Sequence, residues 1–182
     1  MNRRTFLGLS LTIGPAALLA QKISPSQTGV PVQVATGADR FEQPCLLGDH
    51  STIDSKLSSA DTAGQLFIIE NHAQGRFGPP RHVHHEQDEW FYVISGEVVI
   101  EVGEQKYHLL PNDSLLAPRG VPHVWAQVAP AGGRILVAFQ PAGKMEAFFH
   151  ELGKLGGIPP LAQARELFEK HGMMIVGPPL NL

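Results

Sequence analysis

Three histidines and one glutamate stand at spacings that suit a single metal ion. His82 and His84 are two residues apart, and residues i and i+2 of a β-strand point to the same face of a sheet. Glu89 is an odd number of residues further on, but the polar run before it breaks the strand, so its side chain can also turn inward. His123 comes from another strand. Three imidazole nitrogens and a carboxylate, without a thiolate, suit one divalent Fe, Mn, Ni or Cu ion, with Zn less favoured, and disfavour Ca and Mg.

The strand that begins at Glu89 is expected to have two distinct faces. Alternation places Glu89, Phe91 and Val93 inward. The same alternation places Trp90 and Tyr92 outward. Inward aromatic side chains can stack on an aromatic ligand, although core packing explains Phe91 equally well. The expected pocket residues are Phe77, Phe91, Trp125 and Gln127.

Other polar residues near the ligands can have structural roles rather than functional ones. His85 adjoins the ligands but should face away from them. Arg81 and Arg119 either steer an anionic substrate or pair with carboxylates at a sheet edge. Cys45 is the single cysteine, so it forms no internal disulfide. We expect Cys45 to be a small core residue rather than a nucleophile, because no base is recognisable beside it.

The composition is that of a folded domain rather than a disordered chain. The 182 residues are 43% hydrophobic and 17% charged, and the net charge of −3 indicates no basic surface for nucleic acid. The 19 glycines and 15 prolines separate short β-rich runs. We therefore expect one domain, built as a sandwich or barrel of antiparallel strands. The expected strands cover residues 65–70, 89–95, 97–102, 107–110, 114–117, 121–128 and 134–140.

The pattern changes toward the C-terminus. Apolar residues recur at helical spacing over residues 144–155 and again over residues 161–171. Gly156 and Gly157 end the first stripe, and Gly172 ends the second. The two predicted helices either pack on the outside of the barrel or cover its mouth, and the sequence favours neither arrangement.

The first 20 residues have the features of an export signal. Arg3 and Arg4 precede an apolar run from Leu7 to Ala20 that is short for a membrane span. Paired arginines before such a run are typical of a twin-arginine signal, with an ordinary secretory signal as the alternative. Its removal leaves 12 of the 14 basic residues against 17 acidic ones, a net charge of −5. We expect a periplasmic or extracellular protein without a stable membrane span, which begins with a linker or arm over residues 21–37.

Two stretches of the sequence resemble the motifs of the cupin superfamily. The first motif is His-x-His, three or four residues, Glu, six residues and Gly, and the second contains Pro-x-Gly-x-x-His. The matching residues are His82, His84, Glu89, Gly96, Pro118, Gly120 and His123. The resemblance implies an all-β fold, an antiparallel β-barrel of the double-stranded β-helix or jelly-roll type over residues 38–142. A helical tail over residues 143–182 follows it. The resemblance also implies that the three histidines and the glutamate bind the metal.

Two positions depart from the second motif. Asn112 stands where the family usually has glycine, and because asparagine tolerates positive φ, the turn should be kept. Gln127 stands where the family usually has asparagine, which puts a longer amide in the barrel. More narrowly, the segment after Glu89 and the C-terminal tail resemble the small quercetin-dioxygenase-like cupins. That resemblance implies a metal-dependent dioxygenase for an aromatic or enolisable substrate such as a flavonol, with dioxygen as co-substrate and Glu89 as ligand and base.

Two other classes of function stay open at the level of sequence. The barrel can be a non-catalytic protein that binds a small molecule, because this fold hosts many functions. It can also be an isomerase or lyase that uses the metal as a Lewis acid without oxygen. A homodimer is expected as well, since cupins often dimerise by exchanging strands. Residues 30–35 show a weak alternation of apolar residues, which fits a strand added to a partner subunit.

Overall fold

The computed structural model describes residues 30–181. The expected export signal and the first part of the expected arm lie outside the described residues. Residues 30–37, the described part of the arm, form no strand, and Val30 and Val32 are exposed there. The expectation that this arm adds a strand to a partner stays a prediction.

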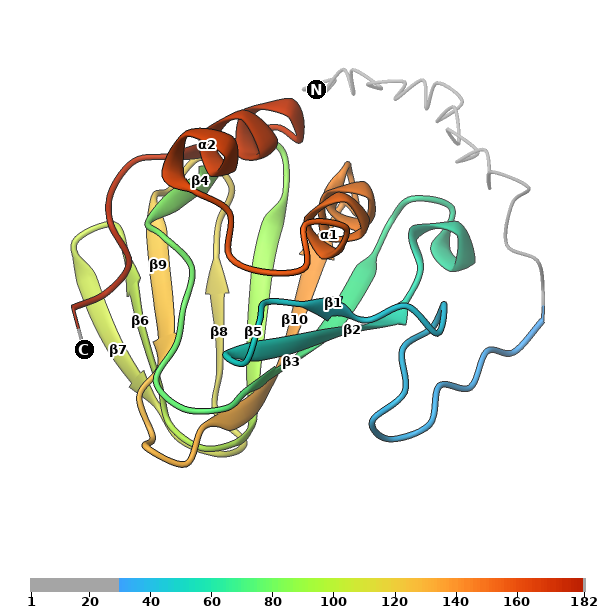
Figure 1. Ribbon diagram of the computed structural model, residues 1–182, viewed down its shortest axis with the longest axis horizontal. Coiled ribbons are helices and arrows are strands. Elements are labelled where there is room, and N and C mark those ends of the chain that lie inside the picture. The colour runs from blue at the N-terminus through green and yellow to red at the C-terminus, as the bar shows by residue number, and fades with distance from the viewer. Residues whose placement is uncertain (1–29, 182) are drawn as a thin grey trace, which may run out of the picture.

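Two antiparallel sheets face each other and form a jelly-roll barrel (Figure 1). The larger sheet contains, in order, β1 (Cys45–Leu46), β2 (Ser51–Leu57), β3 (Phe67–Ala73), β10 (Gly133–Gln140), β5 (Asp88–Ser95) and β8 (Ser114–Ala117). The smaller sheet contains β11 (Met173–Ile175), β4 (His82–His84), β9 (His123–Gln127), β6 (Val98–Val102) and β7 (Gln105–Leu109). This arrangement confirms the expected all-β architecture.

The core fills the space between the two sheets. Along β5, Glu89, Phe91 and Val93 are buried while Trp90 is exposed and Tyr92 is half-buried, as the alternation predicted. The largest side chains with almost no exposed surface include Phe67, Phe91, Phe139, Ile100 and Ile135. Burial of each such side chain contributes about 1.5–3 kcal/mol of transfer free energy, so the facing sheets are held together mainly by these inward residues.

Strand register brings one end of each sheet to the same place. On the larger sheet, Phe139 of β10 lies opposite Glu89 of β5 and also opposite Phe67 of β3. On the smaller sheet, His82 of β4 lies opposite His123 of β9. The strand β11 pairs with the other edge of β4 and so holds β4 in the sheet.

Two helices follow the barrel and lie toward the same end of it (Figure 1). They are α1 (Met145–Gly153) and α2 (Leu161–Lys170), which confirms the two predicted helices. The Glu146 carboxylate accepts hydrogen bonds from Ser58 Oγ at 2.9 Å and from Ser59 N at 2.8 Å. These bonds tie α1 to the short 3₁₀ helix η1 (Ser59–Thr62). In the described chain, neither helix has the length and apolar character needed to cross a membrane.

Candidate metal centre

The structure brings the four expected metal ligands together in the barrel. His82 and His84 come from β4, Glu89 from β5 and His123 from β9, so both sheets contribute. One potential ligand atom from each residue lies within 4.8 Å of the others, and all four residues are buried. Such a cluster is compatible with a single divalent metal ion.

The three imidazole rings converge on one carboxylate oxygen. Glu89 Oε2 lies 2.7 Å from His123 Nε2, 3.1 Å from His84 Nε2 and 3.8 Å from His82 Nε2. Four donor atoms therefore surround one small volume, and each histidine presents the same ring nitrogen, Nε2, to it. This convergence is the geometry that a mononuclear site of three histidines and a carboxylate requires.

Backbone carbonyls set the orientation of two of the rings. His82 Nδ1 lies 2.8 Å from the carbonyl oxygen of Pro80, and His123 Nδ1 lies 3.2 Å from that of Val121. A carbonyl oxygen only accepts, so Nδ1 is the donor in both contacts. The Nε2 lone pair of each ring is therefore available to a metal when that ring is neutral, whereas His123 Nε2 otherwise donates to the Glu89 carboxylate at 2.7 Å. Second partners of this kind commonly fix the tautomer and ring orientation of metal-binding histidines.

His84 supplies an independent indication that a metal belongs here. Both ring nitrogens of His84 are buried and have no hydrogen-bond partner within the described part of the chain. Its Nε2 is close to Glu89, but the geometry is not that of a hydrogen bond. A buried polar atom without a partner costs roughly 1–3 kcal/mol. A metal ion bound at Nε2 would remove that cost, so the residues present fit a metal.

The charge states of the cluster also suit a cation. Burial and the neighbouring charges of His123 and His84 lower the pKa of His82 to about 3, so His82 is neutral at ordinary pH. Burial alone would raise the pKa of Glu89, but the hydrogen bond and charge of His123, together with His84, lower it below its usual range. Burial alone would lower the pKa of His123, but Glu89 raises it. Glu89 is thus an ionised, buried carboxylate that attracts positive charge.

A cavity of about 480 Å³ opens directly onto three of these ligands, His82, His84 and Glu89. Its walls are mostly aromatic and aliphatic. They include Ile53, Ile69, Phe77, Trp125, Val137, Phe139, Met145, Phe148, Phe149, Leu152, Leu161, Ala164 and Phe168. Many of these belong to α1 and α2, which therefore form part of the cavity wall. The structure resolves the question left open by the sequence, because the helices do more than pack on the outside.

Two of the four expected pocket residues do not line this cavity. Phe77 and Trp125 do line it. Phe91 is fully buried in the core, with its ring 6.1 Å from that of Trp125, so it supports the wall from behind. The Gln127 side chain accepts a hydrogen bond from Glu97 N at 2.8 Å, which ties it to the turn between β5 and β6. An inward-facing side chain therefore does not always reach the cavity. Phe91 packs in the core and Gln127 bonds the turn, although both face inward as Trp125 does.

The remaining polar residues have ordinary partners or none near the metal centre. His85 is exposed, as expected. Arg81 pairs with Glu101 at 3.2 Å and Arg119 pairs with Asp88 at 2.7 Å, which favours the structural role for both arginines. Cys45 is buried, and burial with the nearby charge of Asp39 raises its pKa to about 12. A thiol of that pKa is a poor nucleophile.

Sequence reasoning missed several residues that line the cavity. The helix residues Phe148 and Phe168 face it, and Phe168 packs edge-on against His82 with the ring centroids 5.5 Å apart. The apolar helical stripe contained these residues, but the stripe does not reveal what it covers. Asn71 and Arg76 also line the cavity, and no spacing in the sequence points to them.

Comparisons with known proteins agree with this fold. A cupin domain model matches residues 68–139. The crystal structure of a predicted oxalate decarboxylase from Thermotoga maritima is similar with a TM-score of 0.51 and 13% identity, over 54% of this chain and 92% of that one. An RmlC-like cupin from Shewanella frigidimarina has a TM-score of 0.48 and 20% identity, over 62% of this chain and 96% of that one.

A sugar phosphate isomerase of the cupin superfamily from Silicibacter pomeroyi has a TM-score of 0.43 and 22% identity, over 50% of this chain and 60% of that one. No curated protein matches the chain. The Thermotoga structure, the one of these three with a TM-score above 0.5, bears at 13% identity on the fold and not on the reaction. The cupin domain match covers β3 to β10, and the jelly-roll barrel and the buried cluster of three histidines and a glutamate agree with it, so this part of the chain is similar to a cupin domain.

Proposed function

We propose that the protein is a metal-dependent dioxygenase that acts on an aromatic or enolisable substrate such as a flavonol. The observation that carries the proposal is the cavity of about 480 Å³, which reaches the metal centre and is otherwise walled by apolar and aromatic side chains. Its volume lies in the range of small-molecule sites. Burial of a ring-bearing ligand there contributes about 25 cal/mol per Å² of apolar surface.

The residues of the centre have distinct roles in this proposal. A divalent transition metal held by His82, His84, Glu89 and His123 would polarise a substrate oxygen and supply redox chemistry toward dioxygen. Glu89 is the one carboxylate among the described lining residues, and it is ionised. It is therefore the group able to take the proton of a substrate hydroxyl. The apolar walls exclude water, which strengthens polar interactions inside the cavity.

Small polar substrates fit the cavity poorly. A dianion or a sugar phosphate loses its hydration on entry and needs several polar partners in exchange. Apart from the metal ligands, Asn71 and Arg76 carry nearly all the polar side-chain groups of the described lining, and Trp125 adds only an indole N–H. The lining thus favours an aromatic substrate over oxalate-like or phosphorylated ones.

Oxygen uptake by the full chain tests the proposal. The protein would be loaded separately with Fe(II), Mn(II), Ni(II) and Cu(II), and offered a flavonol and a panel of catechols. We expect uptake that depends on both substrate and metal and that is lost in His84→Ala. The matched control is His85→Ala, because His85 is the exposed neighbour of a buried ligand and its loss should leave uptake unchanged.

Two results would replace this proposal with another function. Turnover of the same substrates under nitrogen would identify an isomerase or lyase that uses the metal as a Lewis acid. Tight ligand binding without uptake or turnover, at full metal occupancy, would identify a non-catalytic binding protein.

We also infer that the chain is exported by the twin-arginine route, from Arg3, Arg4 and the apolar run behind them. Replacement of both arginines by lysine keeps the charge that an ordinary secretory signal requires but removes the arginine pair. Cell fractionation should then show the precursor retained in the cytoplasm. Unchanged export of the lysine variant would identify an ordinary secretory signal.

A further inference from the structure

The main cavity is elongated, with the metal centre at one end. On the larger sheet, Glu89 is level with Phe139, whereas Asn71 is opposite Ile135, four residues further along β10. At about 3.3 Å per residue, this places Asn71 about 13 Å from the level of the metal ligands. Since both Asn71 and Glu89 line the cavity, the cavity spans that length.

The smaller sheet gives the same length and leads to Arg76. Phe77 forms a bridge with Gln127, which is four residues along β9 from His123. Phe77 is therefore also about 13 Å from the ligand level. Arg76 precedes Phe77 in the chain and lines the cavity too, so it lies at the end remote from the metal.

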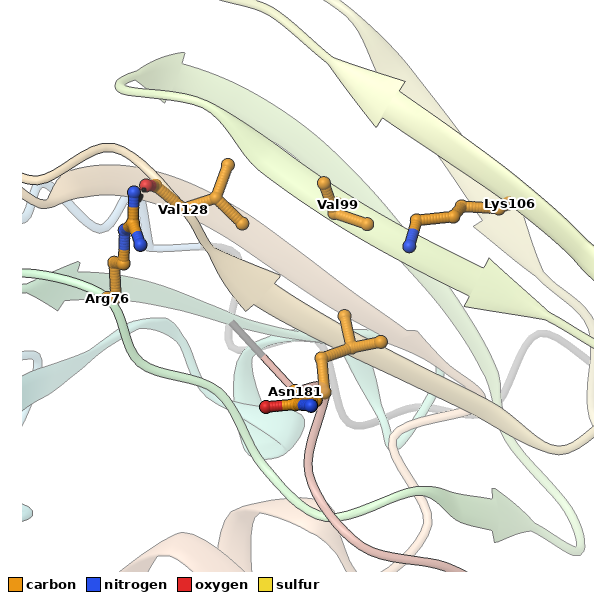
Figure 2. Close-up of a pocket in the computed structure, with 6 residues that line it drawn as sticks. Arg76, Val99, Lys106, Val128 and Asn181 are labelled. Atoms are coloured by element: carbon orange, nitrogen blue, oxygen red, sulfur yellow. Dashed lines mark hydrogen bonds between the residues drawn. The ribbon is translucent and has the colours of Figure 1, made fainter.

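Arg76 also lines a second, smaller pocket of about 220 Å³ outside the barrel. Figure 2 shows Arg76 and Lys106 at opposite ends of this outer pocket, with Val99 and Val128 between them and Asn181 facing them. Leu180, like Arg76, borders both the main cavity and the outer pocket. The two hollows thus share these two residues, and Arg76 borders both of them.

The guanidinium of Arg76 retains free hydrogen-bonding capacity. Its Nε donates to the carbonyl oxygen of Val128 at 3.1 Å. No carboxylate within residues 30–181 forms an ion pair with it. By contrast, Arg40, Arg81, Arg119 and Arg134 each pair with a carboxylate. Arg76 is the one Lys or Arg among the described residues that line the main cavity.

We propose that Arg76 makes the cavity selective for amphipathic ligands, namely ring-bearing compounds with an anionic group opposite the end that faces the metal. The ring system would lie between the apolar walls, and the carboxylate or sulfonate would accept hydrogen bonds from Arg76 at the end remote from the metal. The chain carries a net charge of −3 and so does not attract anions in general, which means that such selectivity must come from this local cation. The inference rests on the proposed function only in that the cavity is taken as the substrate site.

Two fluorescent probes that differ in one charged group test this selectivity. These are 1-anilinonaphthalene-8-sulfonate, which is anionic, and N-phenyl-1-naphthylamine, which has the same ring skeleton and is neutral. Binding to the metal-free full chain would be titrated for wild type and Arg76→Gln. We expect the variant to lose about three- to tenfold in affinity for the anionic probe, because the guanidinium is exposed and partly screened. Its affinity for the neutral probe should stay the same.

The matched control is Lys106→Gln, which removes a cation from the same outer pocket. Lys106 is largely exposed and already pairs with Glu101 at 3.4 Å, so this variant should bind both probes as wild type does. The proposal would be overturned if Arg76→Gln lost affinity equally for both probes or for neither. It would also be overturned if Lys106→Gln lost as much affinity for the anionic probe as Arg76→Gln does. Circular dichroism and thermal melting of each variant would verify that it is folded.

A second measurement separates this inference from the dioxygenase proposal. Catechols with a carboxyl group on chains of increasing length would compete with the neutral probe, alongside their methyl esters. We expect the acids to bind better than the esters only once the chain spans the cavity, and Arg76→Gln should abolish that difference. Because the readout is displacement of a probe, the result stands whether or not any catechol is oxidised. An acid preference that is independent of chain length would contradict the assigned position of Arg76.

Discussion

Among the four proposed ligands, His84 is the one whose ring nitrogens both lack a hydrogen-bond partner in the described chain. Its ring is 1% exposed and lies parallel to that of His123. We expect His84→Ala to abolish stoichiometric metal binding, because three remaining ligands hold a divalent ion less well and the cluster loses a neutral nitrogen. Elemental analysis after gel filtration, with calorimetric titration of the metal, measures this.

His85→Ala is the appropriate control for that experiment. His85 is adjacent in sequence but exposed, so its removal should leave one metal ion per chain. If His85→Ala lost metal and His84→Ala kept it, the assignment of the ligands on β4 would be reversed.

Gln127 has a structural role that its position in the cupin motif does not reveal. Its amide oxygen accepts from the backbone N–H of Glu97, and a Cβ at Gly133 would collide with the amide nitrogen, so the side chain fills the space beneath the turn. We expect Gln127→Ala to lower the free energy of unfolding by about 1–3 kcal/mol, because the Glu97 N–H loses its partner. Chemical denaturation measures the loss.

The same variant should bind the neutral naphthyl probe as wild type does, because Gln127 does not line the cavity. Gln74→Ala, at an exposed glutamine, should leave both stability and binding unchanged. Weaker probe binding in Gln127→Ala at full folding would place its amide in the ligand site after all.

The residues of the centre could be found from sequence because metal ligation constrains both type and spacing. His82 and His84 share a strand face, and Glu89 turns inward after the polar run, which is visible in the residue order alone. Cavity residues are less constrained. Phe91 and Gln127 have the same inward alternation as Trp125, but whether an inward side chain meets a void or another side chain depends on the facing sheet.

At the scale of elements, the long alternating strands and both helices were predictable, while the strands β1, β2 and β11 were not. In β2, Asp54 and Lys56 interrupt the apolar pattern, yet Asp54 is buried because Lys56 and His72 surround its carboxylate. In β11, three residues form a strand only because β4 offers a free edge. Whether such segments form strands depends on contacts with residues distant in the sequence, and the local sequence pattern does not reveal those contacts.

The loop before β4 packs closely against β9 at Gly78, and this close approach is possible because glycine has no side chain. A Cβ there would collide with the backbone oxygen of Trp125 and with Ala126, although the φ angle of Gly78 is not in the left-handed region. We expect Gly78→Ala to lower the free energy of unfolding by about 1–3 kcal/mol through overpacking. It should also weaken probe binding, because Gly78 and Trp125 both line the cavity. Thermal or chemical denaturation with a probe titration measures both effects.

Gly157→Ala controls for the loss of glycine itself. Nothing lies within 4 Å of a Cβ at that position, and its φ is not in the left-handed region. Its stability should stay equal or rise by up to about 1 kcal/mol, since alanine reduces the freedom of the unfolded chain. Equal destabilisation by both substitutions would show that the close approach at Gly78 is not what matters.

At the scale of the whole molecule, the cavity joins parts of the chain that are distant in sequence. Its wall includes residues from β2, β3, β4, β9, β10, both helices and the C-terminal segment that contains Pro179 and Leu180. A ligand there contacts both sheets and the helical tail at once. Occupancy of the cavity and of the metal centre should therefore change the stability of the entire domain rather than of one loop.

Metal removal is the most direct test at this scale, because β4, β5 and β9 all contribute ligands. A metal at 1,000 times its dissociation constant stabilises the folded state by about 4 kcal/mol. For a chain of this size, that corresponds to a rise in melting temperature on the order of 10 °C. Calorimetry should show the drop after chelation and its recovery on reloading, in wild type and His85→Ala but not in His84→Ala. The metal with the largest rise need not be the native one, because affinities follow the Irving–Williams order whatever the function. Chelation that demonstrably removes the ion without lowering the melting temperature would mean that the buried cluster is stable without a metal.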